Sequence, residues 1–268
     1  MRFLIWVVLL GPSLSVFGQS EYYNFSKLNT SNGLSNNQVN AILKDSDGFL
    51  WFGTSSGLDR YDGSSFKIFR KKTDDITSLC DNSITALFQL PDRNIWVMTR
   101  GEPCIYHCDI EKFDTNYNGY LNALHLPSGN ISKIVPGNNN RYWFLYGNFN
   151  LYLYSAKDKR SKRFTHEPTF IPDAKISSVG ETGDGKLWLV YQNGFIQEYD
   201  IKSDKVVFTS TTLQKINRGN IPYELLVDKD GDLWIWSYVY GVFLFHPQDN
   251  SIKQFNENSF PSKLKSNL

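Results

Sequence analysis

The sequence predicts an all-β fold: a β-propeller of four-stranded antiparallel blades, with about five blades present as an incomplete, open part of a larger propeller. Three observations lead to this prediction. Trp residues recur at a nearly constant interval, and apolar and turn-forming residues recur in phase with them. Within each unit, short strand-like runs are divided by turn residues, and their apolar residues follow a period of two, which is typical of β-strands.

The Trp residues set the period of the repeat. Trp51, Trp96, Trp143, Trp188 and Trp234 are separated by 45, 47, 45 and 46 residues. Nine positions before each Trp stands an aliphatic residue: Ile42, Leu87, Ile134, Val179 and Leu225. Four positions before each Trp stands a turn former: Asp47, Asp92, Asn139, Asp184 and Asp230. A fixed interval in this range indicates stacked supersecondary units, and five copies are present.

Each copy divides into four expected strands. In the first copy these are residues 39–45, 49–54, 57–62 and 66–70, and the Asp-Gly pair at 47–48 favours a tight hairpin. The same pair recurs at 184–185 and 230–231. A four-stranded sheet of this kind buries its faces only against neighbours, as in a propeller. We therefore expect the recurring Trp to fill the space between blades rather than to stack on a ligand.

The repeat defines the domain organisation. Residues 1–18 read as a secretory signal peptide, because a short apolar run follows Arg2 and is broken by Gly11-Pro12. Residues 19–268 form the partial propeller, with blades at about 34–75, 76–125, 126–170, 171–217 and 218–260 and the start of a sixth at 261–268. Residues 22–28 resemble an outer strand, which in closed propellers often completes the last blade.

Composition argues against several function classes. The chain has 28 basic and 27 acidic residues, so its charge gives no support to nucleic-acid binding. The basic clusters at 70–72 and 157–163 are expected to be solvated turns. Three cysteines, Cys80, Cys104 and Cys108, allow at most one disulfide, and the sequence leaves open whether any pair is bonded. Cys104 and Cys108 would lie ~13 Å apart on a strand, which favours buried or incidental thiols over a zinc site.

Two short motifs suggest chemistry that their context does not support. GTSSG at 53–57 matches the nucleophile elbow of hydrolases, but no helical pattern follows Ser55 and the other copies have no Ser there. DSDG and DKDGD resemble the start of a calcium loop, yet the twelfth position is Ser56 in one and Val239 in the other, not Glu. We expect no catalytic residue, no metal and no cofactor in this chain.

The best-preserved copy resembles a known repeat. Val39, Ile42, Asp45, Gly48, Leu50-Trp51, Gly53-Thr54, Gly57-Leu58 and Arg60-Tyr61-Asp62, preceded by GLSNNQV, resemble the two-component regulator propeller repeat. That resemblance implies the periplasmic sensor part of a hybrid two-component protein, especially of Bacteroidetes, which detects glycan-derived oligosaccharides to regulate polysaccharide utilisation genes. It further implies that a membrane-spanning kinase and the rest of the propeller belong to sequence beyond this chain, so the chain itself is not an enzyme.

Propeller geometry suggests where a ligand would bind. The loops that join second and third strands, and those that lead into each first strand, are expected to gather on one face. The former carry the candidate ligand-binding residues Arg100, Glu102, Tyr146, Asn148, Tyr191, Gln192, Tyr238 and Tyr240, beside Ser55 and Ser56 in the first blade. For any single one of these residues, an ordinary polar loop residue is the favoured interpretation. A protein-interaction or dimerisation scaffold, and less so a propeller glycosidase or lyase fragment, stay as alternatives.

Overall fold

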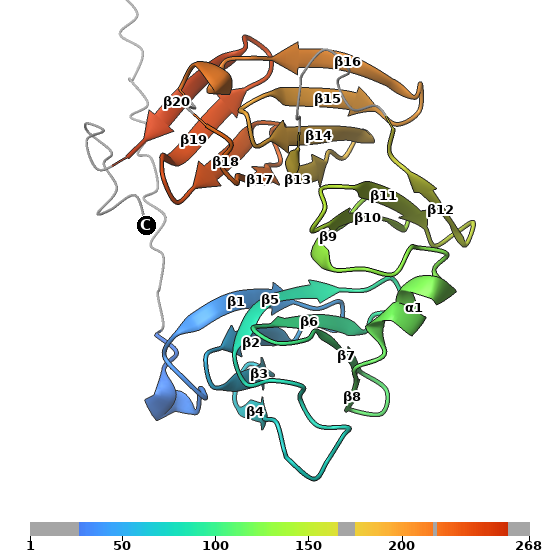
Figure 1. The fold of residues 1–268 in the computed structure, drawn as a ribbon. Helices are drawn as coiled ribbons and strands as arrows, with labels where there is room; N and C mark the ends of the chain where they lie inside the picture. The colour runs from blue at the N-terminus through green and yellow to red at the C-terminus, as the bar shows by residue number, and fades with distance from the viewer. Residues whose placement is uncertain (1–26, 166–174, 217–218, 257–268) are drawn as a thin grey trace, which may run out of the picture.

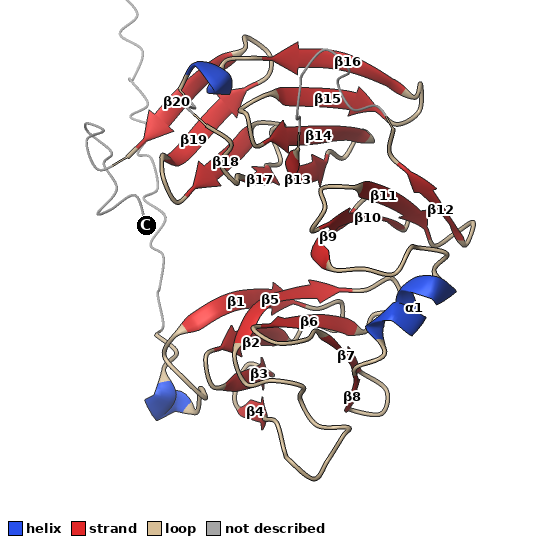
Figure 2. Cartoon of the chain, in the orientation of Figure 1, coloured by secondary structure: helices blue, strands red, loops and turns tan. Residues whose placement is uncertain are grey.

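The computed structural model describes residues 27–165, 175–216 and 219–256, and these form five four-stranded antiparallel sheets (Figures 1 and 2). In every sheet the strands pair in chain order, so the first strand is the inner edge and the fourth is the outer edge. The predicted all-β propeller is therefore confirmed. The signal peptide, most of the strand expected at 22–28 and the start of a sixth blade lie outside the described residues.

The strands of the first three blades follow the expected order. Blade one contains β1 (Val39–Lys44), β2 (Leu50–Thr54), β3 (Gly57–Tyr61) and β4 (Phe66–Phe69). Blade two contains β5 (Ile84–Gln89), β6 (Ile95–Thr99), β7 (Cys104–His107) and β8 (Lys112–Asp114). Blade three contains β9 (Ile131–Pro136), β10 (Arg141–Tyr146), β11 (Leu151–Ser155) and β12 (Arg160–Arg163).

The last two blades repeat this arrangement. Blade four contains β13 (Ile176–Glu181), β14 (Lys186–Tyr191), β15 (Ile196–Asp200) and β16 (Lys205–Ser210). Blade five contains β17 (Glu224–Val227), β18 (Leu233–Ser237), β19 (Gly241–His246) and β20 (Ser251–Phe255). Three short helices lie between blades or before the first: η1 (Thr30–Asn32), α1 (Tyr117–Ala123) and η2 (Leu213–Lys215). The repeat pattern of the sequence does not predict these helices.

The turn between the first and second strands is longer than the two-residue hairpin that Asp-Gly suggested. In all five blades the residue six places before the Trp donates its backbone N–H to the carbonyl four residues later, as Asp45 does to Phe49 at 3.0 Å; the other donors are Leu90, Gly137, Thr182 and Asp228. Gly48 of this turn has φ +92°, a conformation that glycine adopts without strain. Arg93 adopts a φ of +74° in the second blade, so the turn persists there without glycine.

Four of the five recurring Trp side chains fill the space between blades, as predicted. Trp51, Trp96, Trp143 and Trp188 are at most 2% exposed. Each of the four hydrophobic clusters combines the Trp-bearing face of one blade with the opposite face of the next; Trp51, for instance, lies 5.0 Å from the ring of Tyr106 in blade two. Aromatic burial of this kind supplies much of the stabilisation between blades. Trp234 lies on the face of blade five that has no described successor and is only partly buried.

The Trp side chains also have polar partners that the sequence analysis missed. In blade one the indole Nε1 of Trp51 donates to Asp45 Oδ2 at 2.7 Å, while Asp45 Oδ1 accepts the backbone N–H groups of Asp47 and Phe49 at 2.9 Å. Trp234 donates to Asp228 in the same way at 3.1 Å. One carboxylate thus fixes both the turn and the tryptophan, which accounts for the Asp of DSDG and DKDGD without calcium.

Blade three achieves the same contact with a residue from its neighbour. The place of Asp45 is taken by Gly137, and Glu181 of β13 reaches across so that its Oε2 accepts from Trp143 Nε1 at 2.8 Å. A Cβ on Gly137 would lie 2.1 Å from that oxygen. The missing side chain of residue 137 is therefore what admits Glu181.

The blades succeed one another around a shared centre (Figure 1). Inner strands of neighbours pack in sequence order: β1 on β5, β5 on β9, β9 on β13 and β13 on β17. The first and fifth blades share no packing of that extent among the described strands. This arrangement agrees with the predicted open array. No described helix is long and apolar enough to cross a bilayer.

A candidate ligand-binding face

The loops that join second and third strands lie beside the segments that lead into the first strands. The residue after the second strand donates its backbone N–H to the residue that precedes the first strand in four blades: Ser55 to Gln38 at 3.2 Å, Arg100 to Ser83 at 3.0 Å, Gly147 to Asn130 at 2.9 Å and Gln192 to Lys175 at 2.9 Å. These two kinds of loop therefore share one end of each blade, and we call that end the candidate face. It is the arrangement that the repeat predicts.

The candidate residues differ in their accessibility. Arg100, Glu102, Asn148 and Tyr238 are exposed, and Gln192 and Tyr240 are half-buried. Tyr238 is the most accessible aromatic of the set, at 80% exposed. Its neighbour Val239 is 54% exposed, so the turn before β19 presents an aromatic and an aliphatic side chain together.

Tyr146 and Tyr191 are core residues rather than loop residues. Tyr146 is 4% exposed and donates its hydroxyl to the carbonyl of Pro127 at 2.6 Å. Tyr191 is fully buried and donates to Gln197 Oε1 at 2.8 Å. Burial raises the pKa of the Tyr146 hydroxyl. Their expected placement on the surface is wrong, because both side chains point into the space between blades.

Glu102 lies at the edge of a hollow on the candidate face. The hollow has a volume of about 400 Å³ and extends to Lys71, Asp75 and Asp81. Tyr117 of α1 donates its hydroxyl to Glu102 Oε2 at 3.0 Å, and this bond raises the pKa of Tyr117. Glu102 is therefore oriented by a neighbour rather than fully solvated.

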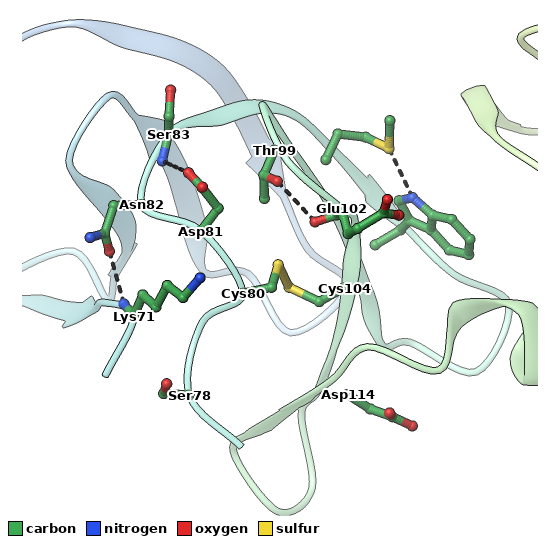
Figure 3. The surroundings of a disulfide bond; sticks show 12 residues. Lys71, Ser78, Cys80, Asp81, Asn82, Ser83, Thr99, Glu102, Cys104 and Asp114 are labelled. Atoms are coloured by element: carbon green, nitrogen blue, oxygen red, sulfur yellow. Dashed lines mark hydrogen bonds between the residues drawn. A yellow bond between two sulfur atoms is a disulfide. The ribbon is translucent and has the colours of Figure 1, made fainter. Parts of the chain in front are cut away.

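A disulfide joins the segment that lines this hollow to strand β7 of blade two. Cys80 and Cys104 are bonded, and Figure 3 places Lys71, Ser78, Asp81 and Glu102 around the bond. Cys108 is the free cysteine of the described residues, and burial raises the pKa of its thiol to about 11. The expectation of a buried or incidental thiol is thus wrong for Cys104. No cluster of His, Cys, Asp and Glu that could hold a metal occurs within the described ranges.

The two glycines of the GTSSG turn are required by close packing. A Cβ on Gly53 would lie 2.5 Å from Ile84 Cγ2 of blade two, and one on Gly57 would lie 2.8 Å from the carbonyl oxygen of Phe69. Ser55 Oγ accepts from Asn40 at 3.3 Å and Ser56 Oγ accepts from Asn36 at 2.9 Å. Among the described side chains no histidine is bonded to either serine, so the turn lacks the base that a nucleophile elbow requires.

Asp59 is a buried carboxylate behind this turn. It is fully buried; its Oδ2 accepts the Ser35 N–H at 2.9 Å and the Ser35 hydroxyl at 2.7 Å, whereas its Oδ1 has no hydrogen-bond partner. Burial raises the pKa of Asp59 above its ordinary value, and the Ser35 bonds and the charge of Arg70 only partly offset that effect. Asp59 thereby connects blade one to the segment that precedes β1.

Asp59 is expected to oppose stability at neutral pH. Because its pKa is higher in the folded chain, the folded state holds the proton more tightly, and stability falls as pH rises from 3.8, the ordinary pKa, through the folded pKa. Asp59→Asn, which cannot ionise, should therefore gain stability relative to the native chain as the pH rises. Urea unfolding of both proteins at several pH values between about 3 and 7 measures this. A difference that stays constant with pH would contradict the assignment.

Part of the chain resembles known proteins. Residues 33–56 match the two-component regulator propeller family. A stretch of 67 residues is 37% identical to Histidine kinase P4 of Formosa agariphila, covering 25% of this chain and 5% of the kinase. The resemblance of blade one to this repeat is therefore confirmed. The match spans only a small part of the kinase.

Solved structures share the fold over most of the chain. The extracellular domain of a hybrid two-component system from B. thetaiotaomicron superposes with a TM-score of 0.52 and 18% identity, covering 90% of this chain and 38% of that one. Virginiamycin B lyase from Staphylococcus aureus, solved with quinupristin, gives 0.53 and 18%, covering 88% and 73%. Such identities establish the propeller fold alone, since sensors and lyases both use it.

Proposed function

We propose that this chain is the ligand-sensing propeller of a hybrid two-component sensor and acts in the periplasm. The observation that carries the proposal is the match of residues 33–56 to the two-component regulator propeller family. The similarity to a histidine kinase and to an extracellular sensor domain supports it. The signal-peptide pattern of residues 1–18 supports export.

The proposed ligand is an oligosaccharide released from a complex glycan, and its binding regulates polysaccharide utilisation genes. The candidate face supports this with an exposed aromatic, Tyr238, and with amide and charged side chains at Asn148, Gln192 and Arg100. Aromatic rings stack on the apolar face of sugars, and amide or charged groups bind hydroxyls. Phosphoryl transfer would belong to a kinase elsewhere in a longer protein, and this chain would bind without catalysis.

A thermal-shift screen tests the proposal. The exported chain, residues 19–268, would be heated with oligosaccharides of two to six sugars from plant, algal and host glycans. A ligand that binds the folded chain raises its Tm, and we expect this for at least one. Tyr238→Ala should weaken that binding about tenfold, whereas Val207→Ala, an exposed residue of β16, should not. A complete absence of binding would contradict the proposal.

A specific observation favours the scaffold alternative as well. Blades one and five each have one face that does not pack against another described blade. Ile42 on that face of blade one is 65% exposed, and Leu226 on that face of blade five is 56% exposed. The equivalents of Ile42 in the other blades are buried. Association through these faces would bury both side chains. Sedimentation of the purified chain distinguishes this role, because a dimerisation scaffold would associate with no saccharide present.

A further inference from the structure

A second hollow also borders the segment that follows β4. It has a volume of about 400 Å³ and is bounded by β4, β8 and residues 70–79. In Figure 1 this segment extends away from the centre of the array before the chain enters β5. We call the hollow the basic groove, for the cations that line it: Lys67, Arg70, Lys72 and Lys112.

The charges of the groove are unbalanced. Its lining has these four cations and two carboxylates, Asp75 and Glu111. Glu111 is already paired with Arg60 at 3.0 Å and with Lys67. Asp75 accepts the Thr77 N–H at 2.9 Å and the Thr77 hydroxyl at 2.7 Å. Within the described part of the chain no carboxylate forms an ion pair with Arg70, Lys72 or Lys112. The Thr77 hydrogen bonds lower the pKa of Asp75, and the charges of Lys72 and Lys112 contribute to that shift. The groove is therefore positively charged.

Apolar side chains lie at the base of the groove, and Ile68 and Ile110 are the well-exposed ones. Phe69 and the buried side chains of Leu79 and Phe113 contribute to its lining. Ile110 is 58% exposed, and the Lys67 ammonium lies 5.4 Å from the centre of the Phe69 ring. Exposed aliphatic side chains beside several cations fit a ligand that has both a C–H surface and anionic groups.

The walls are held in place before any ligand arrives. Phe113 of β8 donates its N–H to the Thr77 carbonyl at 2.9 Å, and Lys72 donates its N–H to Ser78 Oγ at 2.9 Å. Lys71 donates its N–H to Asn82 Oδ1 at 2.8 Å, and the Cys80–Cys104 disulfide fixes the end of the segment. A prearranged site loses less conformational entropy on binding, which favours recognition by this groove.

We propose that the basic groove binds an acidic oligosaccharide, one that carries carboxylate or sulfate groups. The sugar ring would lie against the exposed Ile110 side chain, and its anionic groups would accept hydrogen bonds from Arg70, Lys72 and Lys112. Charge-assisted bonds of this kind are stronger than neutral ones. This inference rests on the proposed saccharide-sensing function and adds a second binding site, apart from Tyr238, for an anionic saccharide. It assigns a role to the basic cluster at 70–72, which the sequence analysis interpreted as a solvated turn.

Calorimetric titration tests the inference. The exported chain would be titrated with a heparin hexasaccharide, which carries both groups, and with neutral maltohexaose of the same length. We expect binding of the first only, weakened at least tenfold by Lys72→Gln with Lys112→Gln. The matched control is Lys157→Gln with Lys159→Gln in the other basic cluster, which should change affinity less than about twofold. Raising NaCl from about 50 to 500 mM should weaken binding further, because salt screens exposed charges.

The outcomes separate this inference from the function it rests on. Equal losses in the two double variants would overturn it, because they would indicate attraction to any positive surface. Binding of heparin unaffected by Lys72→Gln with Lys112→Gln would overturn it too. A third outcome is that neutral oligosaccharides bind through Tyr238 and the heparin hexasaccharide does not bind. This would overturn saccharide binding in the basic groove and would still support the sensing function. Failure of every saccharide would overturn both.

Discussion

Glu181→Ala is expected to destabilise the fold by about 3 kcal/mol, because it strands several buried groups at once. The Glu181 side chain is 1% exposed, and its Oε1 pairs with Arg141 and accepts the Asn138 N–H at 3.1 Å. Its Oε2 accepts from Trp143. Loss of the carboxylate would leave the Arg141 charge and the Trp143 indole N–H without their partner between blades three and four. Urea unfolding measures the effect, and Asp158→Ala at an exposed turn is the control.

A second substitution makes this prediction specific. Gly137 occupies the turn position of Asp45, so Gly137→Asp in the Glu181→Ala background should restore a carboxylate to Trp143 from within the blade and recover about half of the loss. In the native background the same substitution should destabilise, because residue 137 would collide with Glu181 and place two carboxylates together. The same sign of effect in both backgrounds would contradict the assignment.

Removal of the Cys80–Cys104 disulfide is expected to cost about 3 kcal/mol, because the bond closes a loop of this length in the unfolded chain. The two cysteines are 24 residues apart. The double variant Cys80→Ser with Cys104→Ser should have a lower urea midpoint of unfolding than the native chain. Reduction of the native chain should lower the midpoint as much as the double variant does. The segment from 70 to 83 should also become the first site of proteolysis, since the bond anchors its end.

Cys108 supplies the control for the disulfide. Its Sγ contacts only the Arg93 carbonyl among the described hydrogen-bond partners, at 3.4 Å, and it is not bonded to another cysteine. Cys108→Ser should therefore change stability by less than about 1 kcal/mol. A loss in Cys108→Ser as large as in the double variant, or a reduced chain as stable as the oxidised one, would contradict the assignment of structural weight to Cys80–Cys104.

The regular part of the fold could be predicted from the sequence because one large residue is repeated. Trp51 and its equivalents recur with the blade, and each expected strand of blade one lies within one residue of the observed bounds. The helix α1 was not predictable in the same way, because it occurs in one connection only. A helix of seven residues gains its stability from packing, and Leu121 supplies that by burial.

The polar contacts and the site were less accessible to prediction. Asp45 and Trp51 are six residues apart, a spacing repeated by Asp228 and Trp234, so this contact had a signal in the repeat. The Glu181 contact had none, since donor and acceptor lie in different blades. Tyr146 and Tyr191 were expected on the surface, yet each stands three residues after its Trp, as Thr54 does after Trp51, so the repeat already assigned both to the end of the second strand. The structure buries both side chains.

The pairing of blade faces into four separate clusters has a consequence for dynamics. Each cluster joins two neighbours and no third blade, so the array behaves as a chain of nearest-neighbour couplings rather than as a single core. Blades two, three and four are each held on both sides by a described cluster, whereas blades one and five are held on one. Amide hydrogen exchange should therefore be slowest in the strands of blade three and accelerate toward both ends, as independent opening units do.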